Sequence, residues 1–255
     1  MAFVKTEREI ALMRIAGKIL GRTLAALRNE VTPGVSGLTL DSHARDLIRS
    51  FGGEPAFLGY QPYGADRPYP ATLCVSINDV VVHGVPSSRR MQEGDLVKLD
   101  LGVRVKGYYA DAAITVPAGA VSKEAQTLMR ATERALVQGI RSARAGKTLG
   151  DVGYAIKKVA NAYKVSVVKG LTGHGIGSEL HEDPVVLNEG FPGKGMVLVA
   201  GMTIAIEPMF SLGSPRVVQG EDDGYGTSDG SLSAHFEHTV LIGAKGAEVL
   251  TAPIS

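Results

Sequence analysis

The feature that most constrains how this chain folds is an approximate repeat of its own sequence. The run Leu12-Met13-Arg14 recurs 116 positions later as Leu128-Met129-Arg130. The run from Gly94 to Asp100 aligns with the run from Gly201 to Glu207, 107 positions later, and each ends in a carboxylate six residues after its glycine. Small insertions and deletions explain the drifting offset, and chance similarity among common residues is the alternative. We predict an α+β fold of two similar halves, at about 6–117 and 122–250.

No proline- or serine-rich linker separates these halves, so we expect one domain spanning 1–255 with pseudo-two-fold symmetry. Apolar residues at three- and four-residue steps predict a helix over 6–30, and Thr6 followed by Glu9 is typical of a capping box. A second helix is predicted from about residue 39 or 41 to 51. A stretch rich in Gly, Pro and Tyr follows at 52–70, and strand-like runs come after it at 71–77, 80–83 and 96–101.

Composition narrows the class of protein. The 27 Lys and Arg residues nearly balance 26 Asp and Glu, and a net charge of +1 offers no field to concentrate nucleic acid or an anionic membrane. The single cysteine, Cys74, gives no sign of an oxidising compartment, and charged residues interrupt the first twenty positions, where a secretory signal needs an apolar run. The longest apolar run, 196–206, is short of the ~20 residues that cross a bilayer. We expect a cytoplasmic protein that binds neither nucleic acid nor membrane.

Two aspartates are spaced as partners across a hairpin. Asp100 shares a strand face with Lys98, and Asp111 follows eleven residues later, beyond Gly107. An even loop places both carboxylates on one face, directly opposite or one diagonal apart. Like charges this close destabilise a fold unless a cation lies between them. The alternative is a solvated edge hairpin with two ordinary surface aspartates.

Two glutamates stand at the end of, or within, apolar segments. Glu207 ends the most apolar stretch of the chain, directly before Pro208, so we expect its carboxylate to be buried and either paired with an arginine or bound to metal. Glu237 lies in the alternating run 232–240, in which His235, Glu237 and Thr239 share one face. Taken alone, Glu237 is more typical of a solvent-facing strand residue.

Three histidines stand in turn-like contexts. His174 is flanked by glycines in GHGIG, which lets the chain approach a ligand closely. His83 and His181 share a His-x-x-Pro pattern. Taken singly, each is more typical of a loop histidine than of a catalytic one. The glycines around His174 are not a dinucleotide-binding motif, because Pro184 follows too soon for the required helix.

Four carboxylates and one imidazole form a ligand set suited to a pair of divalent cations. In the order GDLVKLDLG, YADAAIT, GHGIG, AIEPM and FEHTV, their surroundings resemble the type I methionine aminopeptidases over essentially the whole chain. The resemblance implies the pita-bread (creatinase/aminopeptidase) fold, a pseudo-two-fold domain that agrees with the internal repeat. It also implies a metal-dependent hydrolase that removes N-terminal methionine.

By the same resemblance, two divalent metal ions (Co, Mn, Fe or Zn) would bind this chain. Asp111 and Glu237 would bridge them, Asp100 would complete one site, and His174 and Glu207 would complete the other.

The resemblance further assigns catalytic roles to three residues. Glu207 would take the proton of the attacking water and pass it to the leaving amine. His83 and His181 would contact the substrate peptide and stabilise the tetrahedral intermediate.

A methionine pocket is also implied by the resemblance, and its expected walls are Tyr60, Tyr69, Cys74 and Tyr225. The family usually has two tyrosines close together in a Gly-Tyr-x-Gly-Tyr-Pro segment. Here QPYGADRP separates Tyr60 from Tyr69, so Tyr63 can substitute for either. Tyr225 stands where an aromatic residue, usually Trp, is expected, and Leu180 stands where a Phe is common.

The implied substrate is a nascent polypeptide with a small second residue. The resemblance also implies a cytoplasmic, bacterial-type monomer that associates transiently with the ribosome. The 29 residues between Glu207 and Glu237 leave no room for the helical subdomain of type II enzymes. One alternative is an Xaa-Pro aminopeptidase or prolidase, which shares the fold and ligands but usually carries a preceding domain. The other is a metal-free binding paralogue, which is disfavoured because all five ligand positions are filled.

Overall fold

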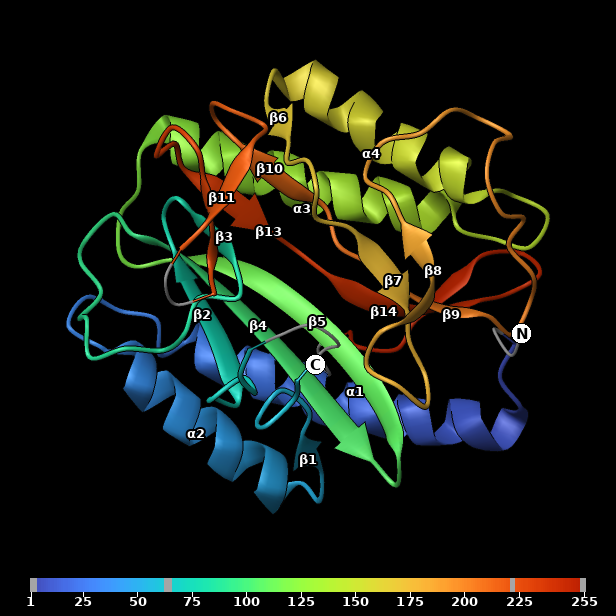
Figure 1. Ribbon diagram of the computed structural model, residues 1–255, viewed down its shortest axis with the longest axis horizontal. Coiled ribbons are helices and arrows are strands. Elements are labelled where there is room, and N and C mark those ends of the chain that lie inside the picture. Colours follow the sequence, from blue (N-terminus) through green and yellow to red (C-terminus); the bar gives the residue numbers. More distant parts are fainter. Residues whose placement is uncertain (1–3, 62–65, 221–222, 253–255) are drawn as a thin grey trace.

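The computed structural model describes residues 4–61, 66–220 and 223–252, in which helices lie on two opposite sides of a set of antiparallel sheets (Figure 1). The helices are α1 (Glu7–Arg28), α2 (Gly37–Ser50), α3 (Lys123–Ser142) and α4 (Leu149–Tyr163). In Figure 1, α1 and α2 lie below the strands, and α3 and α4 lie above them. Each half of the chain therefore contributes one helix pair, as the sequence repeat predicts. The boundaries 6–117 and 122–250 stay a prediction.

Helix starts follow from capping side chains. Thr6 and Glu9 form the predicted capping box, with the Glu9 amide 3.4 Å from Thr6 Oγ1 and the Thr6 amide 2.6 Å from Glu9 Oε2. The predicted start of α2 at 39 or 41 is wrong, because Ser36 caps this helix by accepting from the Thr39 amide at 3.2 Å. Within the described ranges, no helix is both long enough and apolar enough to cross a bilayer.

The first half forms a four-stranded antiparallel sheet in which β4 is central. Its strands are β1 (Glu54–Pro55), β2 (Leu73–Ile77), β4 (Leu96–Val105) and β5 (Tyr108–Pro117), with β1, β2 and β5 all paired to β4. Strand β4 continues four residues beyond the predicted end at 101, because β5 pairs with it along its whole length. This long hairpin carries two of the predicted ligands.

The second half forms a five-stranded sheet, with the strand order β15 (Ala247–Val249), β14 (His238–Ile242), β9 (Thr203–Ile206), β7 (Gly173–Gly175) and β8 (Glu182–Val186). Two three-stranded sheets complete the fold. One has the order β13 (Ser233–His235), β10 (Met209–Ser211), β6 (Ser166–Val167), and the other has the order β11 (Val217–Gln219), β12 (Tyr225–Thr227), β3 (Val80–Val82). The last of these sheets pairs β12 of the second half with β3 of the first half. The two halves therefore share a sheet in the folded structure.

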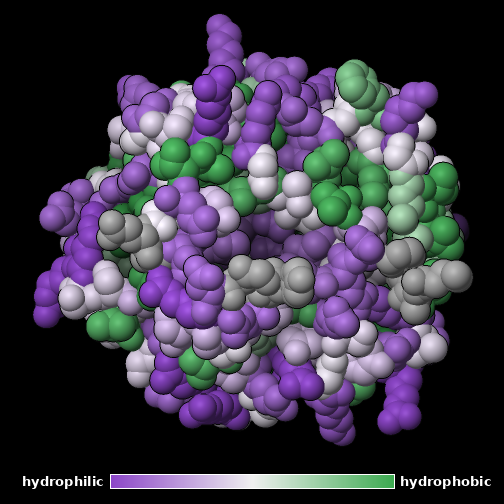
Figure 2. All heavy atoms as spheres, in the orientation of Figure 1, coloured by the Kyte–Doolittle hydropathy of each residue, from purple (hydrophilic) through white to green (hydrophobic). Residues whose placement is uncertain are grey.

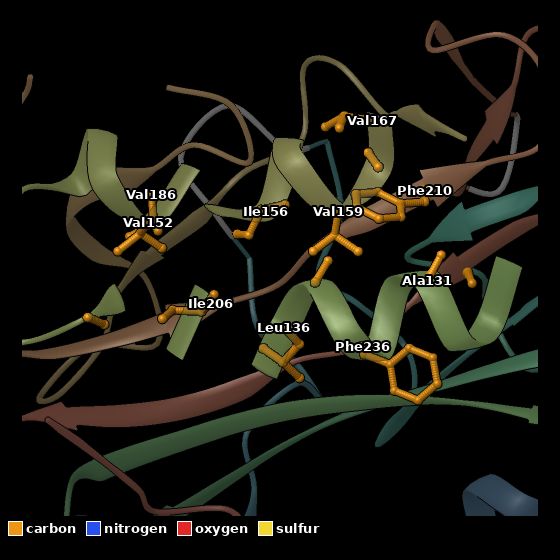
Figure 3. Packing of buried hydrophobic residues seen from close by; sticks show 14 of the residues in the cluster. Ala131, Leu136, Val152, Ile156, Val159, Val167, Val186, Ile206, Phe210 and Phe236 are labelled. Carbon is orange, nitrogen blue, oxygen red and sulfur yellow. The ribbon is translucent and has the colours of Figure 1, made fainter. Parts of the chain in front are cut away.

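Two large apolar clusters hold the helix pairs against the strands. The cluster under α3 and α4 packs Leu136 and Ile156 against Ile206 and Phe210 (Figure 3). The other cluster packs α1 and α2 against β4 and includes the fully buried Leu20. Burying side chains of this size stabilises the fold by roughly 1.5–3 kcal/mol each. These clusters fix β4 and β5 of the first half and β9 and β10 of the second half.

Candidate metal centre and substrate pocket

The β4–β5 hairpin brings Asp100 and Asp111 onto one face. Asp111 is paired with Gly102, two positions from Asp100, so the aspartates lie one diagonal apart. The chain turns at Lys106 and Gly107, whose φ angles of 49° and 88° are typical of a two-residue type I′ turn. Both aspartates are buried, at 8% and 4% exposure. The alternative of a solvated surface hairpin is therefore wrong.

The second half supplies three more predicted ligands to the same place. His174 lies on β7, Glu207 directly follows β9, and Glu237 lies between β13 and β14. His174 Nε2 is 4.0 Å from Asp111 Oδ2 and 3.7 Å from Glu207 Oε1. The expected continuous strand 232–240 is interrupted at Glu237, whose amide donates to the Ala113 carbonyl at 2.9 Å. All five predicted ligands are thus brought together.

Glu207 is buried, as its place after the apolar stretch predicts. In the described part of the chain the imidazoles beside it are those of His174 and His235, whose Nε2 atoms lie 3.7 and 3.4 Å from its carboxylate oxygens. The Asn188 side chain donates to the Glu207 carbonyl at 3.0 Å. The arginine partner that was the alternative for Glu207 is not observed among these residues.

The donor set fits divalent cations. Within the described residues, potential ligand atoms fall within 4.8 Å of one another in three groups: Asp100–Asp111–Glu237, His174–Glu207–Glu237 and Asp111–His174–His181. The buried oxygens Asp100 Oδ1, Asp111 Oδ1 and Glu237 Oε1 have no hydrogen-bond partner there. Unpaired buried carboxylate oxygens are strongly unfavourable unless a cation neutralises them. The residues therefore fit a carboxylate-rich metal centre, in which the first two groups share Glu237.

The same crowding changes the acidity of the carboxylates. Burial raises the pKa of Asp100 to about 6 and that of Glu207 to about 7. Burial, followed by repulsion from neighbouring carboxylates, raises the pKa of Asp111 and Glu237 well above the ordinary range. Without a cation, the site therefore retains protons that a bound cation would displace.

His83 and His181 face the same cavity from loops. The Tyr60 hydroxyl is 2.7 Å from His181 Nδ1, and the rings of His181 and His174 are 4.5 Å apart. His83 has a positive φ of 60°, and its ring packs in a T-shaped arrangement with that of Tyr225, with the ring centroids 5.7 Å apart. Desolvation inside the protein lowers the pKa of both imidazoles below the ordinary value. Both rings are therefore neutral at pH 7, with one N–H available as a donor.

A cavity of about 490 Å³ joins the ligand set to an aromatic wall. Figure 2 shows a recess with hydrophilic residues near the middle of this face of the molecule. The residues predicted for the methionine pocket, Tyr60, Tyr69, Cys74 and Tyr225, all line this cavity. Tyr63 lies outside the described residues. Leu180, 2% exposed, also lines the cavity.

Phe57 and His235 are two of the residues at this site that had no role assigned from the sequence. Phe57 lines the cavity and packs edge-on against Tyr69 at 6.4 Å, although nothing in its local sequence marks it. His235 is 1% exposed, and its Nε2 lies 3.4 Å from Glu207 and 3.9 Å from Glu237. The strand alternation that places His235 on the face of Glu237 was a signal for it.

Comparison with known proteins gives consistent results. The family model of metallopeptidase family M24 matches residues 11–244. The methionine aminopeptidase of Clostridium perfringens is 46% identical over 253 residues, which cover 98% of this chain and 99% of that protein. The crystal structure of methionine aminopeptidase from Thermotoga maritima matches with a TM-score of 0.93 at 40% identity, covering 98% of each chain.

A prolidase structure from Pyrococcus furiosus also matches, with a TM-score of 0.78 at 23% identity. The match covers 99% of this chain and 66% of that one. At this level of identity the likeness concerns the fold alone.

Proposed function

This chain belongs to metallopeptidase family M24, and we propose that it is a methionine aminopeptidase, which hydrolyses the bond after an N-terminal methionine when the second residue is small. The observation that carries this proposal is that the five predicted ligands line the same cavity as the aromatic pocket. Reaction centre and side-chain pocket are thus adjacent, as removal of a single residue requires. The predicted pita-bread fold is confirmed by the family and by the structural neighbours.

Family membership and the ligand clusters support the use of divalent metal. We propose two ions per chain, drawn from Co, Mn, Fe or Zn, with Asp111 and Glu237 shared between them. Asp100 would complete one site, and His174 and Glu207 would complete the other. When bound, such ions lower the pKa of water and polarise the carbonyl that is attacked.

The chain's own residues move the protons in this proposal. Glu207 lines the cavity and would accept the proton of the attacking water and return it to the leaving amine. The neutral His83 and His181 donate hydrogen bonds to the substrate and to its developing oxyanion. The strained φ of His83 is maintained by its neighbour Gly84, whose amide donates to Ser76 Oγ at 3.0 Å. Strain fixed in this way is typical of positioned functional groups.

The aromatic side of the cavity would select the substrate. Tyr60, Tyr69, Cys74 and Tyr225 are proposed to surround the methionine side chain, with Phe57 behind Tyr69. The Tyr69 hydroxyl donates to the Gly84 carbonyl at 3.0 Å, so its ring is fixed relative to the His83 turn. Burying the thioether and methylenes contributes roughly 2 kcal/mol of selectivity.

The natural substrates of this activity are the N-termini of newly made polypeptides. We propose that the chain meets them in the cytoplasm as a monomer associated transiently with the ribosome. Its near-zero net charge and single cysteine support this setting.

A peptide assay tests the proposal. Met-Ala-Ser, Met-Lys-Ser and an Ala-Pro peptide are incubated with the chain after chelation and after addition of Co²⁺, Mn²⁺, Fe²⁺ or Zn²⁺, and bound metal is counted. We expect release of methionine from Met-Ala-Ser only with metal, and much slower release from Met-Lys-Ser. Preferential cleavage of the Ala-Pro peptide would instead favour the Xaa-Pro aminopeptidase alternative, and full turnover in excess chelator would refute the metal requirement.

A further inference from the structure

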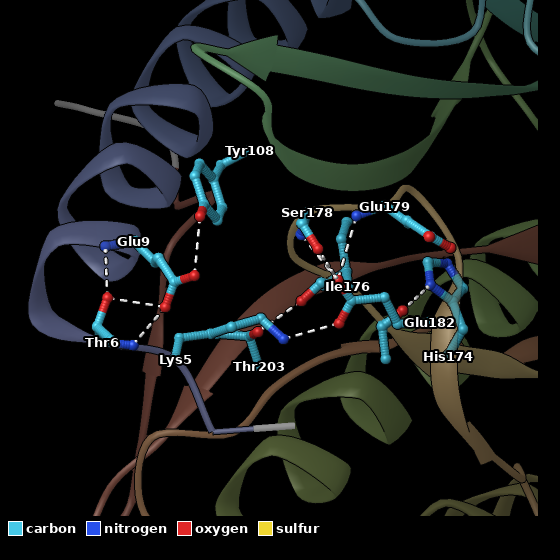
Figure 4. A network of polar contacts seen from close by, with 11 residues as sticks. Lys5, Thr6, Glu9, Tyr108, His174, Ile176, Ser178, Glu179, Glu182 and Thr203 are labelled. Atoms are coloured by element: carbon cyan, nitrogen blue, oxygen red, sulfur yellow. Dashed lines mark hydrogen bonds and ion pairs between the residues drawn. The ribbon is translucent and has the colours of Figure 1, made fainter. Parts of the chain in front are cut away.

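A buried lysine joins the segment before α1 to a loop of the cavity. The Lys5 side chain is 5% exposed, and its Nζ lies 2.7 Å from Glu182 Oε2, across 177 residues of sequence. The Lys5 amide donates to the Gly201 carbonyl at 2.8 Å, which fixes the backbone from which this side chain extends. Figure 4 shows Lys5 reaching from beside α1 to Glu182. Since an ion pair this buried loses solvation, it is retained only where its geometry is good.

Glu182 closes the loop that carries His181. Its other oxygen, Oε1, accepts from the amides of Ser178 and Glu179 at 2.7 and 3.1 Å, and from Ser178 Oγ at 3.2 Å. Burial raises the pKa of Glu182, but the hydrogen bonds from Lys5 and the loop outweigh this and leave the pKa lowered. The carboxylate is therefore ionised and holds both ends of the turn 178–182.

The lysine stem also packs directly under this loop. A Cβ added at Gly177 would lie 2.1 Å from Lys5 Cε, so the lysine stem occupies the space that a side chain at position 177 would fill. From the other side, the Tyr109 amide donates to the Gly177 carbonyl at 2.9 Å. The loop is held between α1's leading segment and strand β5.

His181 directly precedes the anchored Glu182 in the chain. Its Nδ1 is 2.7 Å from the Tyr60 hydroxyl, and its ring lies 4.5 Å from that of His174. A shift of the neighbouring Glu182 therefore moves the imidazole relative to the ligand set.

We propose that Lys5 is a positioning residue, whose ion pair with Glu182 fixes the loop 177–182 and so places the His181 imidazole against the substrate. This inference rests on the role proposed above for His181. It adds a residue from outside the predicted ligand set and the predicted pocket walls, which acts through the Glu182 carboxylate.

The test compares two ion pairs that α1 and its leading segment make with distant residues. Lys5→Met removes the buried pair, and the matched control Arg14→Met removes the exposed pair with Glu248, whose N–O distances are 2.7 and 2.8 Å. With Met-Ala-Ser, Lys5→Met should lower kcat/KM by about 10- to 100-fold, the range for displacing a reacting group by about 1 Å. Arg14→Met should stay within about twofold, because exposed pairs contribute little. Bound metal should be the same in both variants.

Two further measurements separate positioning from general damage. In a His181→Ala background, Lys5→Met should lower kcat/KM no further, because the residue through which it acts is gone. In ¹⁵N-histidine-labelled protein loaded with Zn²⁺, Lys5→Met should shift the ring signals of His181, whereas Arg14→Met should not. If Lys5→Met fails to fold, Glu182→Gln removes the charge with the shape retained and is carried through both measurements.

The proposal is overturned if kcat/KM of Lys5→Met stays within about twofold of wild type, if its loss is undiminished in the His181→Ala background, or if the His181 signals do not move. A wild-type chain that releases no methionine would overturn the proposed function instead. The ¹⁵N ring signals of His181 would still test whether Lys5 positions that imidazole.

Discussion

Removing the metal and removing one carboxylate should change stability in opposite directions. Ligand oxygens of Asp100, Asp111 and Glu237 lie within 4.8 Å of one another. Two full charges at that distance repel by roughly 3 kcal/mol at an effective dielectric constant of about 20. Since burial raises the pKa of these groups, retained protons relieve part of the repulsion. We estimate that about 1–2 kcal/mol of it remains at neutral pH.

Glu237→Gln should therefore stabilise the metal-free protein by about 1–2 kcal/mol, which corresponds to a rise in Tm of roughly 2–8 °C for a chain of this size. In wild type, a cation at a hundred times its Kd should add about 2.7 kcal/mol. The variant should gain much less from the cation, because Glu237 belongs to two of the ligand groups.

Scanning calorimetry at pH 7.5, in EDTA and in saturating Mn²⁺, measures both effects. Glu248→Gln is the control, because its exposed carboxylate lies outside the site and its removal should leave the metal-induced rise in Tm unchanged. The reasoning fails if wild type has the same Tm with chelator and with cation, or if Glu237→Gln lowers the Tm of the metal-free protein.

Three other predictions concern single groups. His83→Ala should lower kcat by about 10²–10³-fold, the usual effect of losing one preorganised donor, and should leave the metal content unchanged. His174→Ala should lose metal and recover part of its activity as metal is added. Metal analysis and turnover measured on both variants distinguish a donor from a ligand. Replacing the substrate methionine by alanine should lower kcat/KM at least about tenfold, and equal rates in the peptide assay would remove the proposed pocket. Asp95→Asn should destabilise the protein by about 1.5–3 kcal/mol at pH 7, because the amides and side chains around Asp95 lower its pKa despite burial. This contribution is complete above the ordinary aspartate pKa of 3.8 and disappears as pH falls through the lower folded value, so urea titrations of both proteins should converge in acid.

Local physics determined the start of the first helix and the geometry of the aspartate hairpin. Thr6 and Glu9 cap α1 whatever the helix packs against, since both side chains lie within its first turn and bond to each other's backbone amides. The two-residue periodicity of strands and the tight turn at Gly107 place Asp100 and Asp111 on one face. Such relations involve only neighbouring dihedral angles and short loops, so the residues themselves decide them.

Similarity of motifs, rather than local preference, added His174, Glu207 and Glu237 to that hairpin. Their order along the chain matched a known pattern, but no periodicity shows that β7, the end of β9 and the break at Glu237 meet the hairpin. Packing settles this: each apolar cluster holds one helix pair on the strands of its own half, and β14 contacts β5 between them.

Only the tertiary structure decided which of several equivalent local signals was used. Ser36, Thr39 and Asp41 are all suitable N-caps, and α2 begins after Ser36 because the Leu38 amide donates to the Ser87 carbonyl at 3.2 Å. Lys5 and Glu182 are ordinary charged residues in sequence, and they become a buried pair only when the segment before α1 lies beside the loop after β7. Contacts across so many residues depend on the summed packing of every intervening element, which no local pattern records.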